Sequence, residues 1–369
     1  MSHAALVVWG AFGVSFVLGA IANRTAFCTL GAVADIVNMG AWGRMRMWLL
    51  AMAIAILGAQ GLDLAGVVDL SRSFYTRPAF TWLSYIAGGF MFGIGMTLSS
   101  GCASRTLVRI GGGNLKSVVV LIVTAVAAYM TLKGLFGIWR TGYLDSVWLD
   151  WAAHGAQGQD LPSLLSALSG MDVKSLKPAI ILLIAGVLLA FVFRDRDFRT
   201  SPDHILGGAA FGLAVCAGWA ITGNLGFGEN PDTLEATFFA TNSHTIESLS
   251  FVSPLAYGLE LLERWSDKSL AITFGVAAAA GMMLGSFAYA LATRSFRWEG
   301  FTTIEDLRNH LLGGVLMGFG GVTALGCTIG QGVSGISTLA LGSILALCAI
   351  IAGCVVTLKY QYWKLSQEA

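Results

Sequence analysis

Charged residues are scarce in this 369-residue sequence, where Asp, Glu, Lys and Arg together make up only 12%. Soluble domains carry about 25% charged residues, whereas hydrophobic residues here reach 56%. Such a chain cannot cover a compact globule with polar side chains, which excludes a soluble enzyme.

Two further shortages narrow the class. The net charge is only +1 and no basic stripe is present, which excludes a nucleic-acid-binding protein. Only six cysteines occur, and most lie in apolar runs, which excludes a secreted disulfide scaffold. The class that is left is a membrane protein that crosses the bilayer several times.

Long uncharged apolar runs are what the sequence has in abundance. A helix needs about 20 such residues to cross a bilayer, and the runs lack the alternating period of an outer-membrane barrel. The nine runs cover residues 5–22, 47–62, 82–98, 117–132, 178–193, 205–223, 270–293, 311–325 and 334–358. No basic segment precedes the first run, so we interpret it as a retained span and not as a signal peptide. We therefore predict an all-α polytopic membrane protein with about nine transmembrane helices in one domain, residues 1–369.

The distribution of basic residues predicts the orientation. Nine spans place the two termini on opposite sides of the membrane. Loops on the N-terminal side hold eight of the 22 Lys and Arg residues, and the other side holds the remaining fourteen. Because basic loops stay inside, we expect the N-terminus outside and the C-terminus in the cytoplasm.

An internal repeat relates the two halves of the chain. Residues 88–102 (GGFMFGIGMTLSSGC) match residues 313–327 (GGVLMGFGGVTALGC) at an offset of 225, with six identities that end in the same Gly-Cys pair. An odd linking span, 178–193, gives the second half the opposite orientation. This predicts inverted repeats over roughly 5–132 and 205–358, with the substrate path near the midplane between matched Gly-rich segments.

Three cysteines interrupt the apolar pattern. Cys28, Cys102 and Cys327 each follow a short or interrupted span, and Gly101 and Gly326 directly precede two of them. A Gly-Cys pair at such a break puts the thiol near the start of the next helix, where free N–H groups and the helix dipole favour an anion. Non-helical backbone at membrane depth must line a cavity or be buried in protein. We therefore expect re-entrant loops that fold back towards the midplane.

Polar neighbours of these breaks have two readings each. Arg105 either attracts an anion or follows the positive-inside rule. Gln331, one turn after Cys327 and close to Thr328, either donates to an anion or caps its loop. No Asp or Glu lies within the nine spans, which argues against a carboxylate relay inside the helices.

Other sequence features favour simpler roles. The remaining cysteines, Cys216, Cys348 and Cys354, lie inside long apolar runs and fit small hydrophobic residues. Residues 133–177 place three tryptophans beside charges and predict an interfacial segment. Residues 224–269 contain leucines at helical spacing and predict a re-entrant or interfacial helix.

Two kinds of chemistry compete with anion transport at the cysteines. Three soft ligands suit Cu(I) or Zn, but the sequence has no Cys-x-x-Cys, and its five histidines are scattered. A redox disulfide relay usually needs a close dithiol, which single cysteines on separate loops do not provide. No nucleotide-binding P-loop motif is present, so direct ATP hydrolysis is not expected.

The stretch GCTIGQGVSGISTLALGS at 326–343, with the Gly-Cys loops and the hydropathy pattern, resembles the YeeE/YedE family of sulfur-compound importers over nearly the whole chain. The resemblance implies a thiosulfate permease of the bacterial inner membrane, with no enzyme activity and no cofactor. It implies three essential cysteines along a narrow central path, which carry over to Cys28, Cys102 and Cys327. The anion would pass by transient hydrogen bonds to successive thiols, and a separate TusA-like sulfur carrier would receive it in the cytoplasm.

Two alternatives stay open within this resemblance. The cargo is thiosulfate or another sulfur or selenium compound, such as sulfite or sulfide. Alternatively, the protein is a membrane sulfurtransferase that forms a persulfide on one cysteine.

Overall fold

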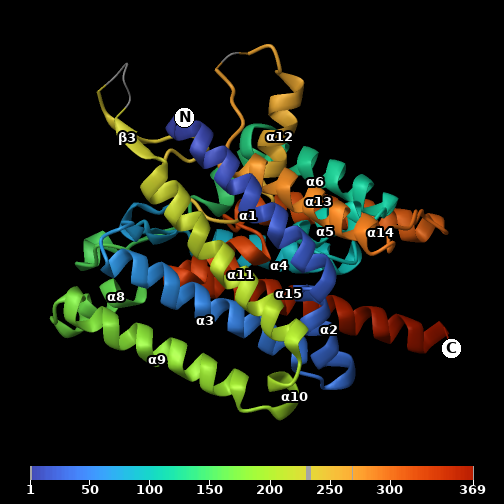
Figure 1. Ribbon diagram of the computed structural model, residues 1–369, viewed down its shortest axis with the longest axis horizontal. Coiled ribbons are helices and arrows are strands. Elements are labelled where there is room, and N and C mark those ends of the chain that lie inside the picture. The colour runs from blue at the N-terminus through green and yellow to red at the C-terminus, as the bar shows by residue number, and fades with distance from the viewer. Residues whose placement is uncertain (1, 230–233, 268, 369) are drawn as a thin grey trace.

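The computed structural model describes residues 2–229, 234–267 and 269–368, and most of them are helical (Figure 1). Among these residues, eight helices are long and apolar enough to cross a membrane. Two of these spans, His3–Met39 and Trp82–Gly111, are each broken into two helices. The prediction of an all-α polytopic membrane protein is confirmed.

The long helices follow the predicted apolar runs. They are α1 (His3–Thr25), α3 (Gly43–Leu64), α4 (Trp82–Leu98), α6 (Leu115–Lys133), α9 (Val173–Phe193), α11 (Pro202–Ala220), α13 (Phe274–Ala292), α14 (Ile304–Thr323) and α15 (Leu341–Glu368). The run 311–325 lies mostly in α14, which is not among the eight helices that are apolar enough to cross a membrane. Its first turns carry Glu305, Asp306 and Arg308, so only its second half is apolar.

Short elements complete the chain. The short helices are α2 (Thr29–Met39), α5 (Ala103–Gly111), α7 (Leu135–Trp139), α8 (Leu161–Ser169), α10 (Arg196–Arg199) and α12 (Ser253–Glu263). Two antiparallel strand pairs join β1 (Ala79–Phe80) to β2 (Leu149–Asp150) and β3 (Phe227–Glu229) to β4 (Ala236–Phe238). The helix expected in the segment 224–269 is present as α12.

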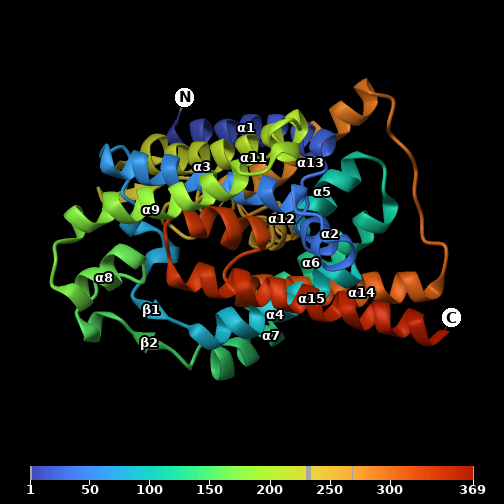
Figure 2. The same cartoon turned by 90° about the horizontal axis from the view of Figure 1, so that it is seen from below.

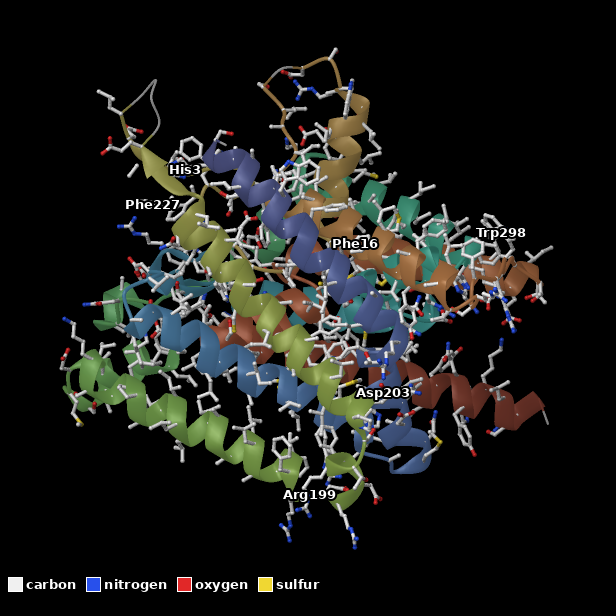
Figure 3. The ribbon with its side chains drawn as sticks, in the orientation of Figure 1. His3, Phe16, Arg199, Asp203, Phe227 and Trp298 are labelled. Carbon is white, nitrogen blue, oxygen red and sulfur yellow. The ribbon has the colours of Figure 1, made fainter. Side chains whose placement is uncertain are left out.

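The two chain ends lie at opposite ends of the helix bundle (Figures 1 and 2). Figure 3 shows His3 and Phe227 together at one end, which we call the N-terminal face. Asp203 and Arg199 lie at the other end, the C-terminal face, where Asp203 pairs with Arg24 at 3.0 Å. The helices therefore run between a face with the N-terminus and a face with the C-terminus.

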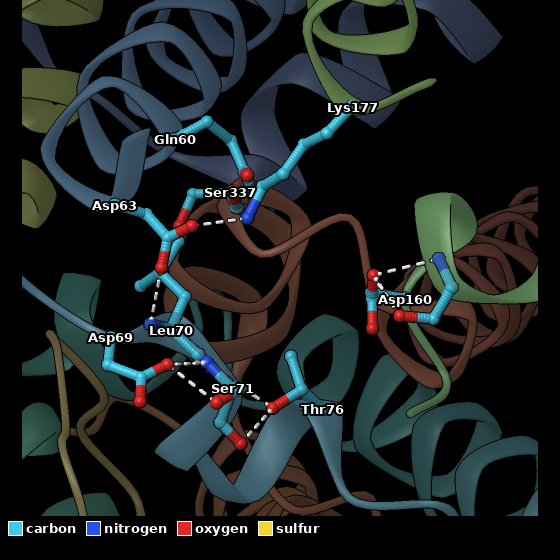
Figure 4. Close-up of polar contacts among 10 residues, drawn as sticks. Gln60, Asp63, Asp69, Leu70, Ser71, Thr76, Asp160, Lys177 and Ser337 are labelled. Atoms are coloured by element: carbon cyan, nitrogen blue, oxygen red, sulfur yellow. Dashed lines mark hydrogen bonds and ion pairs between the residues drawn. The ribbon is translucent and has the colours of Figure 1, made fainter. Parts of the chain in front are cut away.

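Polar contacts fix α3 at the N-terminal face (Figure 4). Lys177 of α9 donates to one carboxylate oxygen of Asp63, and the other oxygen accepts the N–H of Leu70 at 2.7 Å. The buried Gln60 donates to the carbonyl of Ser337 at 2.8 Å. These contacts hold α3 against the linking helix α9 and against the second half of the chain.

Helices α4 and α14 cross at matched glycines. A Cβ on Gly88 would lie 2.9 Å from the carbonyl oxygen of Gly320, and a Cβ on Gly95 would lie 2.7 Å from that of Gly313. Only glycine permits this approach of the two backbones. Gly313 is the repeat counterpart of Gly88, and Gly320 is that of Gly95. The offset of 225 therefore exchanges the two contacts, as expected of segments related by a pseudo-twofold axis.

Candidate functional site

The three predicted cysteines share one local geometry. Two positions before each cysteine, a non-glycine residue has left-handed backbone: φ is 50° at Ala26, 59° at Ser100 and 57° at Leu325. Each cysteine then immediately precedes a new helix, which is α2, α5 or the helical segment 328–337. The repeated turn places each thiol at a helix N-terminus, where unpaired N–H groups and the helix dipole are available to an anion.

Backbone donors at these helix starts hold two of the sulfur atoms. The N–H of Gly31 donates to Sγ of Cys28, and the N–H of Gly330 donates to Sγ of Cys327, each across 3.4 Å. Sγ of Cys102 lies 3.2 Å from the hydroxyl oxygen of Ser104. A thiol sulfur that accepts from the backbone keeps its S–H available as a donor.

The three thiols form one buried series. Cys28, Cys102 and Cys327 are 9%, 1% and 0% exposed, and all three are free. Cys102 interacts electrostatically with both Cys28 and Cys327, so it lies near each of them. Tyr75 interacts electrostatically with Cys327, and Arg105 interacts electrostatically with Cys28. We refer to this arrangement, in the order Cys327, Cys102, Cys28, as the thiol series.

A cavity of about 420 Å³ opens on the N-terminal side of the thiol series. Its lining combines arginines, serine hydroxyls and aromatic rings, including Arg77, Arg140, Ser243, Ser250 and Tyr257. The lining also includes Leu325, two positions before Cys327. The cavity therefore adjoins the loop that carries the first thiol.

Tyr75 and Ser250 lie between this cavity and Cys327. A Cβ on Gly330 would be 2.6 Å from Oγ of Ser250 and 3.4 Å from the hydroxyl oxygen of Tyr75. Tyr75 is 1% exposed, and its hydroxyl has no hydrogen-bond partner in the described part of the chain. A buried unpaired hydroxyl is costly and suits a passing polar ligand.

Sequence reasoning missed Tyr75 and Ser250. They belong to the connections 65–81 and 226–252, far from Cys327 along the chain. Trp48 is similar, because its Nε1 is buried without a partner among the described residues while its ring lies against Gly332. No spacing in the sequence marks these residues, since only the tertiary fold brings them to the thiol series.

Arg105 and Arg109 have different surroundings. Arg105 follows Cys102 by one turn and is partly buried, with no ion pair or hydrogen bond found within residues 2–229, 234–267 and 269–368. It is within electrostatic range of both Cys28 and Cys102. Arg109 instead donates to the carbonyl of Ser100 at 2.9 Å. Arg105 is thus the cation that faces the thiols, whereas Arg109 supports the turn before Cys102.

The predicted neighbours of Cys327 are all buried. Gln331 donates through Nε2 to the carbonyl of Ala324, so its amide caps the loop, while its Oε1 has no partner in the described chain. Thr328 is 0% exposed, and its hydroxyl is likewise unpaired there. A Cβ on Gly326 would lie 3.1 Å from Cγ of Gln331, so the glycine gives this side chain room. Gly101 has the matching position in the first half, where its Cβ would lie 3.2 Å from Cγ of Arg105.

The other candidate groups lie elsewhere. Sγ of Cys216 contacts the carbonyl of Ile54 at 3.7 Å, Cys348 is exposed on α15, and Cys354 is buried against neighbouring helices. Within the described residues, no group of three or more His, Cys, Asp or Glu side chains is arranged to hold a metal ion.

The comparisons with known proteins concern the chain as a whole. The family model described as "Sulphur transport" matches residues 24–356. The thiosulfate transporter TsuA of Escherichia coli K12 is 26% identical over 86% of this chain and 84% of its own length. The thiosulfate transporter TsuA of Spirochaeta thermophila is 25% identical over 94% of this chain and 97% of its own length.

The family match covers all three cysteines of the thiol series. The relatives are named as transporters and not as enzymes. Together with the membrane-spanning helices, the family match identifies a multi-pass membrane protein for a sulfur compound. Because the family model spans most of its length, this chain belongs to the Sulphur transport family.

Proposed function

We propose that this protein is an inner-membrane thiosulfate uptake permease, in which the anion passes Cys327, Cys102 and Cys28 by transient hydrogen bonds to their thiols. The observation that carries the proposal is the thiol series itself: three free thiols at helix N-termini, in one buried row next to a cavity. The names of the relatives support thiosulfate as the cargo.

The chemistry of thiosulfate fits such a path. Its terminal sulfur is soft and accepts S–H hydrogen bonds, whereas its oxygens accept backbone N–H bonds at helix starts. Sulfate lacks the soft end, so a constriction lined by thiols favours thiosulfate. Each thiol hydrogen bond is weak, which lets the ion leave one site for the next.

Other residues assist along this path. Thr328 and Gln331 offer unpaired polar atoms beside Cys327, and Gly101 and Gly326 allow the tight turns before two of the thiols. Arg105 attracts the anion towards Cys102 and Cys28 from the C-terminal side. The path thus passes hydroxyl groups beside Cys327 and a cation beside Cys102 and Cys28.

The same proposal sets the direction of transport. The N-terminal face with its cavity lies outside the cell, and the C-terminal face with most of the basic residues lies in the cytoplasm. The two halves are inverted repeats, which the exchanged glycine contacts of α4 and α14 support. A separate TusA-like sulfur-carrier protein receives the ion at the cytoplasmic face.

Uptake of radiolabelled thiosulfate tests the cargo. Cells that lack their own sulfate and thiosulfate importers are compared with and without this protein, in the presence of unlabelled sulfate, sulfite, sulfide or selenite. We expect uptake that only excess thiosulfate competes away efficiently. Stronger competition by sulfite or selenite would replace thiosulfate as the cargo, and no uptake of any of these anions would contradict the proposal.

Mass spectrometry distinguishes the permease from a membrane sulfurtransferase. We expect unmodified cysteines after exposure of the purified protein to thiosulfate, because hydrogen-bond transfer forms no covalent intermediate. A stable gain of about 32 Da on one cysteine would indicate a persulfide and would contradict the non-covalent path.

A further inference from the structure

The cavity at the N-terminal face contains one carboxyl group among its lining residues. Glu247 shares this lining with Arg77 and Arg140 and with several serine hydroxyls. A carboxylate in the entrance of an anion path is unexpected, because like charges repel strongly where water is limited. The surroundings of Glu247 decide whether its charge is neutralised.

Hydrogen bonds, and not ion pairs, hold the carboxyl group of Glu247. Its Oε1 accepts the backbone N–H of Ser243 at 2.8 Å and the Ser243 hydroxyl. No Lys or Arg in the described residues forms an ion pair with it. Arg140 is already paired with Asp145 at 3.2 Å. Arg77 also lines the cavity but has no ion pair within the described chain.

The titratable groups that face Glu247 come from three other segments and its own loop. Tyr75 lies in the connection 65–81, Tyr257 in α12, and both sense its charge. His244, in the same loop, is exposed and interacts weakly with it. Arg77 and Arg140 line the same cavity.

Partial burial makes the ionised form of this carboxyl more costly than in water. Desolvation raises the pKa of Glu247 above its ordinary value, against the opposing effect of the hydrogen bonds from Ser243. The neutral form is therefore populated at a higher pH than in an exposed glutamate. A second anion in the cavity would favour the neutral form further.

We propose that Glu247 is a proton-dependent gate of the outer cavity: thiosulfate occupies the cavity when this carboxyl is protonated. This inference rests on the proposed function and adds a dependence of its entrance on pH. With Glu247 neutral, the dianion meets Arg77 and the serine hydroxyls. With Glu247 ionised, it meets a carboxylate in a confined space.

Uptake into proteoliposomes at equal pH on both sides tests the gate. Thiosulfate stays a dianion in neutral and weakly acidic solution, so its own charge does not change over a pH series that runs from neutral to weakly acidic. We expect the initial rate of the wild type to rise about tenfold as the pH falls across this range. Glu247→Gln keeps the carboxyl neutral, so its rate should be high and nearly independent of pH.

Matched variants separate this gate from other titrating groups. Asp267→Asn removes a half-buried carboxylate of the α12–α13 connection, and His244→Gln removes an imidazole from the loop of Glu247. Both should keep the wild-type pH profile. Ser243→Ala removes a hydrogen bond that favours the ionised form, so its profile should move to higher pH. This shift also tests the gate if Glu247→Gln fails to fold.

The outcomes distinguish the gate from the permease. A wild type that transports thiosulfate, with profiles unchanged in both Glu247→Gln and Ser243→Ala, would overturn the gate and leave the permease intact. A pH profile that His244→Gln abolishes would assign the effect to the imidazole and overturn the gate as well. A wild type that transports no thiosulfate at any pH would contradict the proposed function itself.

Discussion

The breaks at Cys102 and Cys327 are repeat counterparts, and they differ most at the third residue after each cysteine. The first half has Arg105 there, and the second half has Gly330. Arg105 faces Cys28 and Cys102 with its charge, whereas Gly330 leaves space that Ser250 and Tyr75 fill with hydroxyl groups. One local geometry thus supports a cation after Cys102 and neutral hydroxyl groups after Cys327. In the proposed permease, this difference would distinguish the surroundings of the two thiols.

Filling the space at Gly330 tests the role of the hydroxyl groups beside Cys327, and it should have the largest effect. In Gly330→Ala, the new Cβ would lie 2.6 Å from Oγ of Ser250, which is closer than real contacts allow. Overpacking of this kind costs about 1–3 kcal/mol, so we expect thiosulfate uptake to fall about tenfold or more.

A second substitution serves as the control. Ser250→Gly removes the clashing side chain, so the double variant Gly330→Ala with Ser250→Gly should regain most of the lost uptake. A double variant as inactive as Gly330→Ala alone, at equal abundance in the membrane, would contradict the steric explanation.

Removing the charge of Arg105 tests the role of the cation beside Cys102 and Cys28. Arg105→Gln keeps a polar side chain, although a shorter one, and loses the charge that faces the thiols. We therefore expect uptake to fall about fivefold, equivalent to about 1 kcal/mol. Arg109→Gln is the matched control, because Arg109 supports the Ser100 carbonyl instead. Initial rates measured at several salt concentrations should show the larger change for Arg105→Gln. An equal effect of both variants would contradict a specific role of Arg105 at the thiols and would indicate that it only adds positive charge on the cytoplasmic side.

Tyr75→Phe should have the smallest effect of the three. The hydroxyl of Tyr75 is buried without a partner in the described chain, so its removal should leave the thermal unfolding temperature unchanged or slightly raised. Loss of one donor to the passing anion should reduce uptake about twofold to threefold. Reduced uptake together with a clear loss of thermal stability would indicate a structural role for Tyr75.

The sequence predicted the helices and the positions of the breaks well. Apolar runs predict spans through their length alone, and the repeated Gly-Cys pairs at 101–102 and 326–327 mark the turns directly. The exception is α14, because the charged residues in its first turns make it less apolar than a membrane-spanning helix. The geometry of Cys28 was harder to foresee, because Phe27 replaces the glycine there, yet Ala26 adopts the same left-handed turn.

The surroundings of the thiols could not be predicted in this way. Tyr75, Ser250 and Glu247 lie in long connections without periodicity. Only packing of both halves brings Ser250 and Glu247 to the cavity and Tyr75 to Gly330. The order of the thiols also depends on tertiary structure. The sequence spacing of Cys28 and Cys102 does not show how far these thiols lie from each other or from the two faces of the membrane. The spacing of residues along the sequence indicates local structure, whereas the surroundings of the thiols depend on contacts between segments that are far apart in the chain.

Single alanine variants of the thiol series test the central claim most directly. Uptake of labelled thiosulfate is compared for Cys28→Ala, Cys102→Ala and Cys327→Ala, with Cys216→Ala as the control because it lies outside the series. At equal abundance in the membrane, we expect at least about tenfold lower uptake in the three variants of the series and wild-type uptake in the control. Normal uptake in all three variants of the series would contradict a path formed by these thiols.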